Sequence, residues 1–187
     1  GELVCKNPFP SMPLKFWNDK NDKKFKGAYF TRFPNTWHHG DYAEIKETNG
    51  FIIHGRSDTT LNPGGVRLGT AEIYSEVEKF KEVKEAIVVG QSWDNDVRII
   101  LFLTMSKKFK VKEDLFNKIK TKIRKNASPR HIPSKIIVIK DIPRTKSGKI
   151  VELAVKQTIE GNSIKNIDAL ANPEALEQFK NLKELSF

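Results

Sequence analysis

The sequence contains one cysteine, Cys5, and no long apolar run. A single thiol excludes an internal disulfide and a metal cage built of cysteines, which fits a reducing compartment such as the cytoplasm. A membrane-spanning helix needs roughly 20 consecutive apolar residues, and no segment approaches that length. The first residues, Gly1 to Cys5, lack the basic and then apolar order of a signal peptide. We therefore expect a cytoplasmic protein without membrane partners.

Methionine is also missing from position 1, which is Gly1. We expect the chain to be part of a longer protein, although processing could equally leave a glycine first. Of its 187 residues, 38% are hydrophobic and 30% are charged, a composition typical of a globular protein that can bury one core.

Acidic residues are scarce between positions 107 and 149, where fifteen lysines and arginines accompany only three acids. Much of the formal net charge of +10 therefore lies in this stretch. Such a field could attract nucleic acid, an anionic membrane or a phosphorylated small molecule, and charge alone does not choose among them. A solvated face kept soluble by lysines is the simpler alternative.

Helical periodicity is absent from the first 35 residues, which hold four prolines and seven aromatic residues. We expect an ordered, loop-rich segment without helices, whose aromatic side chains pack against other parts of the protein. Residues 42–47 and 51–54 then form two short β patterns around Thr48, Asn49 and Gly50. This arrangement predicts a β-hairpin.

From position 58 onwards, helical and strand patterns alternate. The spacing of apolar residues predicts a helix over 72–80, with Thr70 as its N-cap, and a second helix over 112–126. We expect two further helices near 152–159 and 173–179. Residues 86–89, 97–103 and 136–139 are rich in β-branched residues, and we expect the first two to be central strands. The fold class is therefore α+β: a small mixed α/β domain with a central β-sheet flanked by helices, preceded by a loop and β-hairpin segment.

The segment from Pro143 to Lys149 is not a nucleotide-binding P-loop. A P-loop needs glycine where Pro143 stands and Ser or Thr where Ile150 stands. What remains is Lys149 at the end of a basic loop with a glycine. Such a loop can carry a cation into another domain's active site, where it stabilises negative charge that develops in a transition state. An ordinary surface turn is the alternative.

A second glycine-bearing segment begins at Gly55 and runs to Arg67. Gly64 and Gly65 allow the backbone to approach a ligand closely, and Arg67 can bind a phosphate with its forked guanidinium. A tight turn with a surface arginine is the alternative.

Neighbouring histidines, His38 and His39, do not predict a metal site. Adjacent side chains on an extended segment point in opposite directions, and no third ligand is placed by the sequence. Asp41 has a more specific interpretation, because a carboxylate at a strand edge can accept hydrogen bonds from both hydroxyls of a ribose.

In this order and spacing, these motifs resemble the adenylate-forming ligase superfamily, which includes the acyl-CoA synthetases. The resemblance implies that Asp41, Arg56 and Arg67 bind ATP or AMP and that Asp58 is the hinge between two domains. It also implies that Gly64 and Gly65 line the CoA tunnel, that Arg124 lies near the CoA 3′-phosphate, and that Lys149 is the adenylation lysine. Residues 1–57 would end a large N-terminal adenylation domain, and residues 58–187 would form a C-terminal lid with a family-specific extension.

Several stretches resemble the branch of the superfamily that activates acetoacetate, including residues 1–13, 62–67, 127–133, 151–156 and 172–176. This resemblance implies acetoacetate, ATP and CoA as small-molecule substrates, with ATP and Mg²⁺ bound mainly by an N-terminal domain that these residues do not include. The chain by itself would then be inactive. It also raises the possibility of an acyltransferase and a deacylase that modify Lys149, since acylation removes its charge.

Two alternatives stay open. The enzyme could activate another short-chain acid, such as acetate or propionate, because the acid pocket would lie outside these residues. A basic nucleic-acid-binding module would explain the charge, and its aromatic residues between positions 9 and 33 could stack on bases. The second alternative leaves the glycine motifs unexplained, so we do not expect a nucleic-acid partner.

Overall fold

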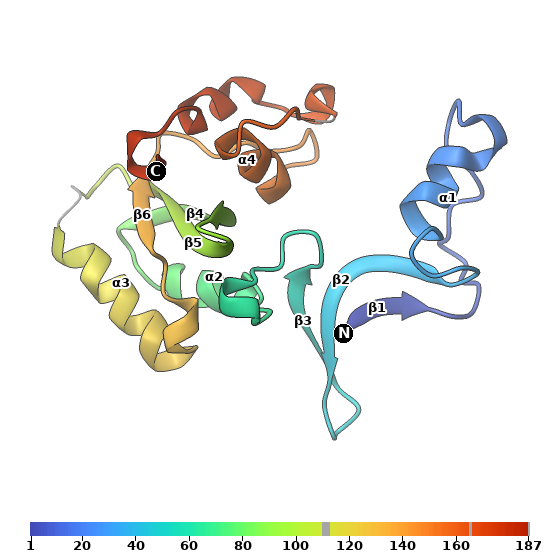
Figure 1. Ribbon diagram of the computed structural model, residues 1–187, viewed down its shortest axis with the longest axis horizontal. Helices are drawn as coiled ribbons and strands as arrows, with labels where there is room; N and C mark the ends of the chain where they lie inside the picture. Colours follow the sequence, from blue (N-terminus) through green and yellow to red (C-terminus); the bar gives the residue numbers. More distant parts are fainter. Residues whose placement is uncertain (110–112, 165, 187) are drawn as a thin grey trace. The chain divides into compact units, whose positions relative to one another are not determined.

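A computed structural model describes residues 1–109, 113–164 and 166–186. The chain divides into two compact units, Gly1–Asp58 and Thr59–Phe187, and each is considered by itself (Figure 1). Their division falls directly after Asp58, the predicted hinge. The assignment of 1–57 and 58–187 to two domains of a longer enzyme stays a prediction.

The first unit contains a three-stranded antiparallel sheet in the order β1-β2-β3. The strands are β1 (Glu2–Cys5), β2 (Trp37–Ile45) and β3 (Phe51–Arg56). The predicted hairpin is confirmed as β2 and β3, with Asn49 of its turn at φ 60°. Strand β2 begins five residues earlier than predicted because its first residues pair with β1, a partner far away in the sequence.

Helix α1 (Lys23–Tyr29) corrects the expectation that the first 35 residues contain no helix; a 3₁₀ turn, Lys20–Asp22, precedes it. The Asp19 carboxylate accepts hydrogen bonds from the backbone N–H groups of Lys24 and Phe25, at 2.8 and 2.7 Å. The Tyr29 ring stacks on Trp37 with 3.7 Å between centroids. The Asp19 hydrogen bonds and the aromatic contacts stabilise this seven-residue helix. Neither produces a helical periodicity of apolar residues in the sequence, which is why the helix was not predicted.

The second unit is built on a sheet in the order β4-β5-β6. Its strands are β4 (Val83–Trp93), β5 (Asp96–Met105) and β6 (Lys135–Val138). Strands β4 and β5 are antiparallel and joined by Asp94 and Asn95, both with positive φ, as a type I′ turn requires. In this sheet, as far as the structure describes it, only β5 has neighbours on both sides, so the expectation that residues 86–89 form a central strand is wrong.

Strand β5 separates two hydrophobic clusters because its side chains alternate between the faces of the sheet. Ile99, Leu101 and Leu103 point to the face covered by α2 (Ala71–Val77) and α3 (Glu113–Asn126). Ile100 and Phe102 point to the opposite face, covered by α4 (Glu152–Ile159) and the C-terminal segment. Helices thus cover both faces, which confirms the predicted α+β fold class (Figure 1).

The predicted helices match the structure, except that α2 ends at Val77, three residues before the predicted end at Phe80. Ile73 and Val77 of α2 are fully buried, as are Ile119 and Ile123 of α3. Position 112, the first of the predicted second helix, lies outside the described residues. Thr70 occupies the N-cap position of α2, but its side chain makes no capping hydrogen bond, contrary to the prediction.

The described part of the C-terminal segment, residues 166–186, contains three 3₁₀ helices, Ile167–Ala169, Pro173–Phe179 and Lys183–Leu185. The helix expected near 173–179 is present, and its Phe179 is fully buried against Phe102 with 4.9 Å between ring centroids. The segment is therefore part of the core. Among the described residues, no helix has the length and apolar character needed to cross a bilayer.

Candidate functional site

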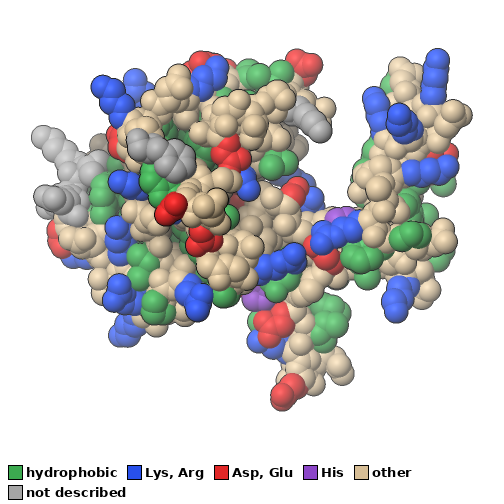
Figure 2. Space-filling view, viewed as in Figure 1, with side chains coloured by type: hydrophobic (Ala, Val, Ile, Leu, Met, Phe, Trp, Pro, Cys, Tyr) green, Lys and Arg blue, Asp and Glu red, His purple; other side chains and the backbone are tan. Residues whose placement is uncertain are grey.

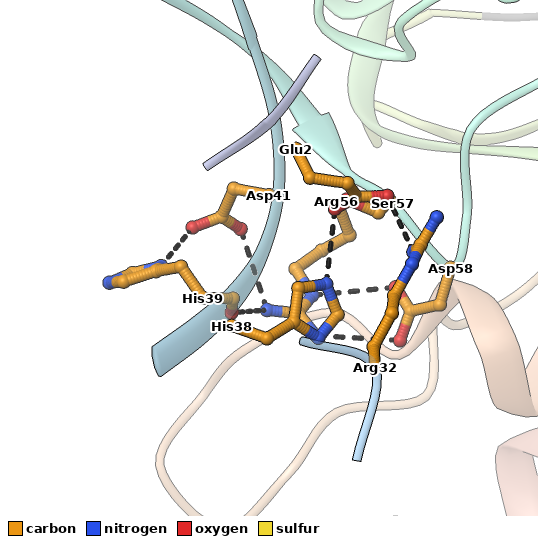
Figure 3. A network of polar contacts seen from close by, with 8 residues as sticks. All are labelled: Glu2, Arg32, His38, His39, Asp41, Arg56, Ser57 and Asp58. Carbon is orange, nitrogen blue, oxygen red and sulfur yellow. Dashed lines mark hydrogen bonds and ion pairs between the residues drawn. The ribbon is translucent and has the colours of Figure 1, made fainter. Parts of the chain in front are cut away.

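Asp41, Arg56 and Asp58 lie together at the end of the first unit (Figure 3). Asp41 of β2 pairs with Arg56 of β3 in the strand register. The Arg56 guanidinium donates to the Asp41 carboxylate at 3.4 Å and to the Asp58 carboxylate at 3.4 and 3.5 Å. The pairing of β2 with β3 thus brings two predicted nucleotide-binding residues beside the predicted hinge.

Gly40 allows the Arg56 guanidinium to lie against the backbone of β2. Its φ is 82°, in the left-handed region that glycine favours. Arg56 also donates to the His39 carbonyl at 3.1 Å, and the Ser57 N–H donates to the Gly40 carbonyl at 2.9 Å. The glycine before Asp41 therefore has a specific structural role.

Glu2 forms a second set of polar contacts nearby, which the sequence did not predict (Figure 3). Its carboxylate accepts from the Ser57 hydroxyl at 2.5 Å and contacts Arg32 at 2.6 Å and His38 at 3.1 Å. Burial raises the pKa of Glu2, but the hydrogen bonds from Ser57 and His38 and the charge of Arg32 outweigh it and leave the pKa below its usual value. No local motif marks Glu2, because these partners are distant in sequence.

The adjacent histidines bind different carboxylates: His38 contacts Glu2, and His39 contacts Asp41. Their opposite directions agree with the alternation of an extended segment. In the part of the chain that the structure describes, no three His, Cys, Asp or Glu side chains are grouped to hold a metal ion.

In the second unit, Gly64 and Gly65 form a 3₁₀ turn, Pro63–Gly65, with positive φ at both glycines. The Gly64 N–H donates to both oxygens of the Asp96 carboxylate, at 2.8 and 3.0 Å. A β-carbon at Gly65 would meet no atom within 4 Å. One side of this turn is therefore anchored while the other is open. Arg67, two residues further, is exposed.

A depression of about 430 Å³ lies beside this turn. Its lining includes Pro63, Trp93, Arg98 and Arg130. The Arg98 guanidinium stacks on the Trp93 ring at 3.3 Å from the centroid, a cation–π contact. Arg130 has a nitrogen 3.7 Å from where a β-carbon of Gly64 would stand. The sequence did not single out Arg98 or Arg130, since only tertiary packing brings them to the glycine turn.

Lys149 closes a tight turn. Its backbone N–H donates to the Thr145 hydroxyl at 3.0 Å, and its carbonyl accepts from the Thr145 N–H at 2.9 Å. Gly148 has φ 83° and donates to the Thr145 carbonyl at 2.8 Å. The Lys149 side chain is exposed, and its ammonium has no ion pair within the described residues.

Arg124 lies in the last turn of α3 and is exposed. Lys and Arg side chains are spread over the α3 side of the face in Figure 2. Of the acids in the basic stretch, Asp114 pairs with Lys118 at 2.5 Å. Residues 110–112 of that stretch lie outside the described residues.

Comparison with known proteins matches part of the second unit to a protein family. Residues 72–149 match the model of the "AMP-binding enzyme C-terminal domain". The match of this AMP-binding C-terminal domain begins in α2 and ends at Lys149.

Relatives extend the similarity to the whole chain. Acetoacetyl-coenzyme A synthetase of Rhizobium meliloti is 58% identical over 185 residues, and acetoacetyl-CoA synthetase of Xenopus tropicalis is 50% identical over 187 residues. Each alignment covers 99% of this chain but only 28% of the relative. The structure is also similar to acetoacetyl-CoA synthetase from Streptomyces lividans, with a TM-score of 0.88, 37% identity and coverage of 96% of this chain and 27% of that one.

The similarity includes the first unit as well as the AMP-binding C-terminal domain. The predicted resemblance to the adenylate-forming acyl-CoA synthetases is confirmed. These comparisons do not favour a nucleic-acid-binding module. They do not test the roles of the individual residues in the site, which stay predictions.

Proposed function

We propose that this chain is the C-terminal part of an AMP-forming acetoacetate–CoA ligase. The observation that carries the proposal is the 58% identity to acetoacetyl-coenzyme A synthetase of Rhizobium meliloti over 99% of the chain. The reaction would convert acetoacetate, ATP and CoA into acetoacetyl-CoA, AMP and pyrophosphate. Since the chain spans 28% of that relative, most of the substrate pocket would belong to the preceding domain of the same protein.

In the first step, a carboxylate oxygen of acetoacetate attacks the α-phosphorus of ATP, and pyrophosphate leaves. Negative charge on the α-phosphate and the acid oxygen needs a cation placed close to both. Lys149 fits this role because its ammonium is exposed at the end of an ordered turn and has no ion pair within the described residues. A site shielded from water would strengthen the interaction.

Asp41 would accept hydrogen bonds from the ribose hydroxyls of ATP or AMP. Its carboxylate is held by Arg56 on one side and His39 on the other, so it is oriented before the nucleotide arrives. Arg56 would support the same site, and Arg67 would contact a phosphate group. Mg²⁺ would bind with ATP mainly in the preceding domain.

In the second step, the CoA thiol attacks the acyl-adenylate and AMP leaves. We propose that the second unit turns about Asp58 between the two steps, removing Lys149 and presenting Gly64 and Gly65 to the thiol carrier. The open side of the Gly65 turn supports this role, because a chain of carrier atoms can pass close to its backbone. Arg124 would pair with the 3′-phosphate of CoA.

Variant Lys149→Ala in the full-length enzyme tests the assignment of Lys149. We expect adenylate formation, measured by ATP–pyrophosphate exchange, to be abolished. Thioester formation from preformed acetoacetyl-adenylate should remain, because Lys149 acts only in the first step. Lys180→Ala is the matched control, since Lys180 is exposed and pairs with Glu177 at 2.6 Å. Equal loss of both half-reactions would contradict the assignment.

Asp58→Pro tests the hinge in the same enzyme. Proline restricts φ at position 58 and the conformation of Ser57 before it. We expect one half-reaction to slow far more than the other, because one orientation of the second unit is trapped. Normal rates in both half-reactions would exclude Asp58 as the pivot.

A panel of short acids tests the acyl substrate. Acetoacetate should give the highest kcat/KM, and a preference for acetate or propionate would support the alternative of another short-chain synthetase.

We further propose a cytoplasmic location and reversible acylation of Lys149 by an acyltransferase and a deacylase. Mass spectrometry of the purified protein for acyl-lysine at position 149 tests the modification.

A further inference from the structure

The Arg144 side chain spans the base of the turn that carries Lys149. Its Nη1 atom donates to the Gly148 carbonyl at 2.9 Å, and its Nη2 atom pairs with the Glu85 carboxylate on β4. Both side chains of the ion pair are only 29% exposed. Since Gly148 directly precedes Lys149, the guanidinium ties the tip of the turn to the sheet.

Asn172 in the C-terminal segment holds the same turn from its other end. Its Oδ1 atom accepts from the Arg144 N–H at 2.8 Å. Its Nδ2 atom donates to the Asp141 carboxylate at 2.7 Å and to the Ile142 carbonyl at 3.0 Å. The Asn172 amide thus forms hydrogen bonds with three positions of the chain, 141, 142 and 144, where it enters the turn.

Backbone hydrogen bonds complete the attachment. The Ala171 N–H donates to the Arg144 carbonyl at 2.8 Å, and the Lys146 N–H donates to the Ala169 carbonyl at 3.0 Å. Asn172, Ala171 and Ala169 all lie beyond residue 149, where the match to the AMP-binding C-terminal domain ends. Part of the support for the Lys149 turn therefore comes from the C-terminal segment, which lies outside that match.

We propose that Arg144 is a positioning residue for Lys149, and that Glu85 and Asn172 hold Arg144 in place for that purpose. The inference rests on the proposed function of Lys149. Lysine has a long, flexible side chain, so the place of its ammonium depends on where the turn fixes its backbone. A misplacement of about 1 Å can cost on the order of 100-fold in rate.

The role is confined to one half-reaction. Arg144 touches Gly148 and Glu85 but would not touch substrate, and its effect passes through the placement of Lys149. In the proposed second step Lys149 has left the reaction centre, so the support of its turn no longer matters there. A merely structural role would instead weaken both half-reactions together with the folded state.

Variants Arg144→Gln, Glu85→Gln and Asn172→Ala in the full-length enzyme test the inference. We expect the turnover rate of adenylate formation to fall on the order of 10- to 100-fold, with little change in the KM for ATP. Thioester formation from preformed acetoacetyl-adenylate should be unchanged. Glu85→Gln is the mildest change, because glutamine keeps the size and an accepting oxygen, and it keeps the test informative if another variant folds poorly.

Arg144→Lys and Lys180→Ala are the controls. A lysine at position 144 has one side-chain nitrogen and cannot bond the Gly148 carbonyl and the Glu85 carboxylate with the geometry of a guanidinium fork. The rate of adenylate formation should therefore lie between the rates of Arg144→Gln and wild type. Lys180→Ala removes a cation from the C-terminal extension without touching the turn, and should leave both half-reactions intact.

Parallel measurement of Lys149→Ala separates this inference from the proposed function. If Lys149→Ala leaves adenylate formation intact, the proposed function of Lys149 is wrong. If Lys149→Ala abolishes adenylate formation while Arg144→Gln and Glu85→Gln leave it normal, only the positioning role is wrong. Equal losses in both half-reactions for Arg144→Gln and Glu85→Gln, with a lowered melting temperature, would also overturn it.

Discussion

A β-carbon at Gly40 would lie 2.6 Å from the Nη2 atom of Arg56. Real β-carbons essentially never approach other atoms so closely, so a β-carbon at position 40 would displace the flexible end of the Arg56 side chain. Gly40 and Arg56 thus lie in close contact beside Asp41, and the positive φ of Gly40 is the feature that favours glycine at this position.

Gly40→Ala should destabilise the first unit and displace Arg56 from Asp41. The strained backbone alone costs on the order of 1–3 kcal/mol. In the full-length enzyme we expect faster hydrogen exchange of the β2 amides and a raised KM for ATP. Gly27→Ala is the control, because Gly27 lies in α1 and a β-carbon there meets nothing within 4 Å. Alanine in a helix should stabilise by roughly 0.5–1 kcal/mol.

Gly90→Ala should overpack the sheet of the second unit. A β-carbon at Gly90 would lie 2.8 Å from the Val97 Cγ1 atom and 3.4 Å from the Leu61 Cδ2 atom. We expect a loss of about 1–3 kcal/mol in the free energy of unfolding. The double variant Gly90→Ala with Val97→Ala removes the clashing methyl group and should recover part of that loss in a double-mutant cycle. Simple additivity would show that the clash is not the cause.

Phe179→Ala should destabilise the second unit by about 3–5 kcal/mol, the usual cost of removing a fully buried phenylalanine. The lost contact with Phe102 leaves a cavity beneath the C-terminal segment. Hydrogen exchange of β5 amides in the full-length protein measures the local loss. Leu153→Ala is the control, since Leu153 is 40% exposed on α4 and should cost much less. Equal effects would mean that the segment is not part of the core.

Glu76 should make the stability of the second unit depend on pH. Hydrogen bonds from Lys79 at 2.5 Å, and from Asn126 at 2.7 Å, hold the pKa of Glu76 below its usual value despite burial. A carboxyl whose pKa is lowered in the folded state contributes stability above the unfolded pKa, near 4.3, and loses it as pH falls through the folded pKa.

The test compares wild type and Glu76→Gln between about pH 7 and pH 3, using hydrogen exchange or melting temperature. Wild type should be more stable at neutral pH, and the difference should shrink as pH falls below about 4.3. Glu177→Gln, which alters an exposed pair with Lys180, should show little dependence. A difference that stays constant over the whole range would exclude the titration of Glu76 as its cause.

Local patterns in the sequence predicted much of the second unit. The β-branched composition of residues 97–103 predicted a central strand, and the structure confirms it as part of β5, which pairs with β4 and β6. The helical spacing likewise predicted an apolar face of Leu115, Phe116, Ile119 and Ile123 in α3. Leu115, Ile119 and Ile123 are buried, and Phe116 is partly buried against them. These features depend on the periods of helices and strands, which a single segment of sequence already contains.

Other features were decided only by tertiary structure. Strand β1 exists because Val4 and Cys5 pair with residues more than 30 positions away, and the edge position of β4 depends on where β6 joins the sheet. The contacts of Arg144 with Glu85 and Asn172 join three distant segments.

The sequence by itself thus determined the types of most elements, the family motifs and the residues that carry charge. Tertiary structure decided which of those residues meet across distant segments: Arg56 with Asp41, and Arg144 with Glu85 and Asn172. The physical reason is that periodicity is a property of neighbouring residues, whereas an ion pair or a strand pairing needs two segments whose approach is set by the packing of the whole unit.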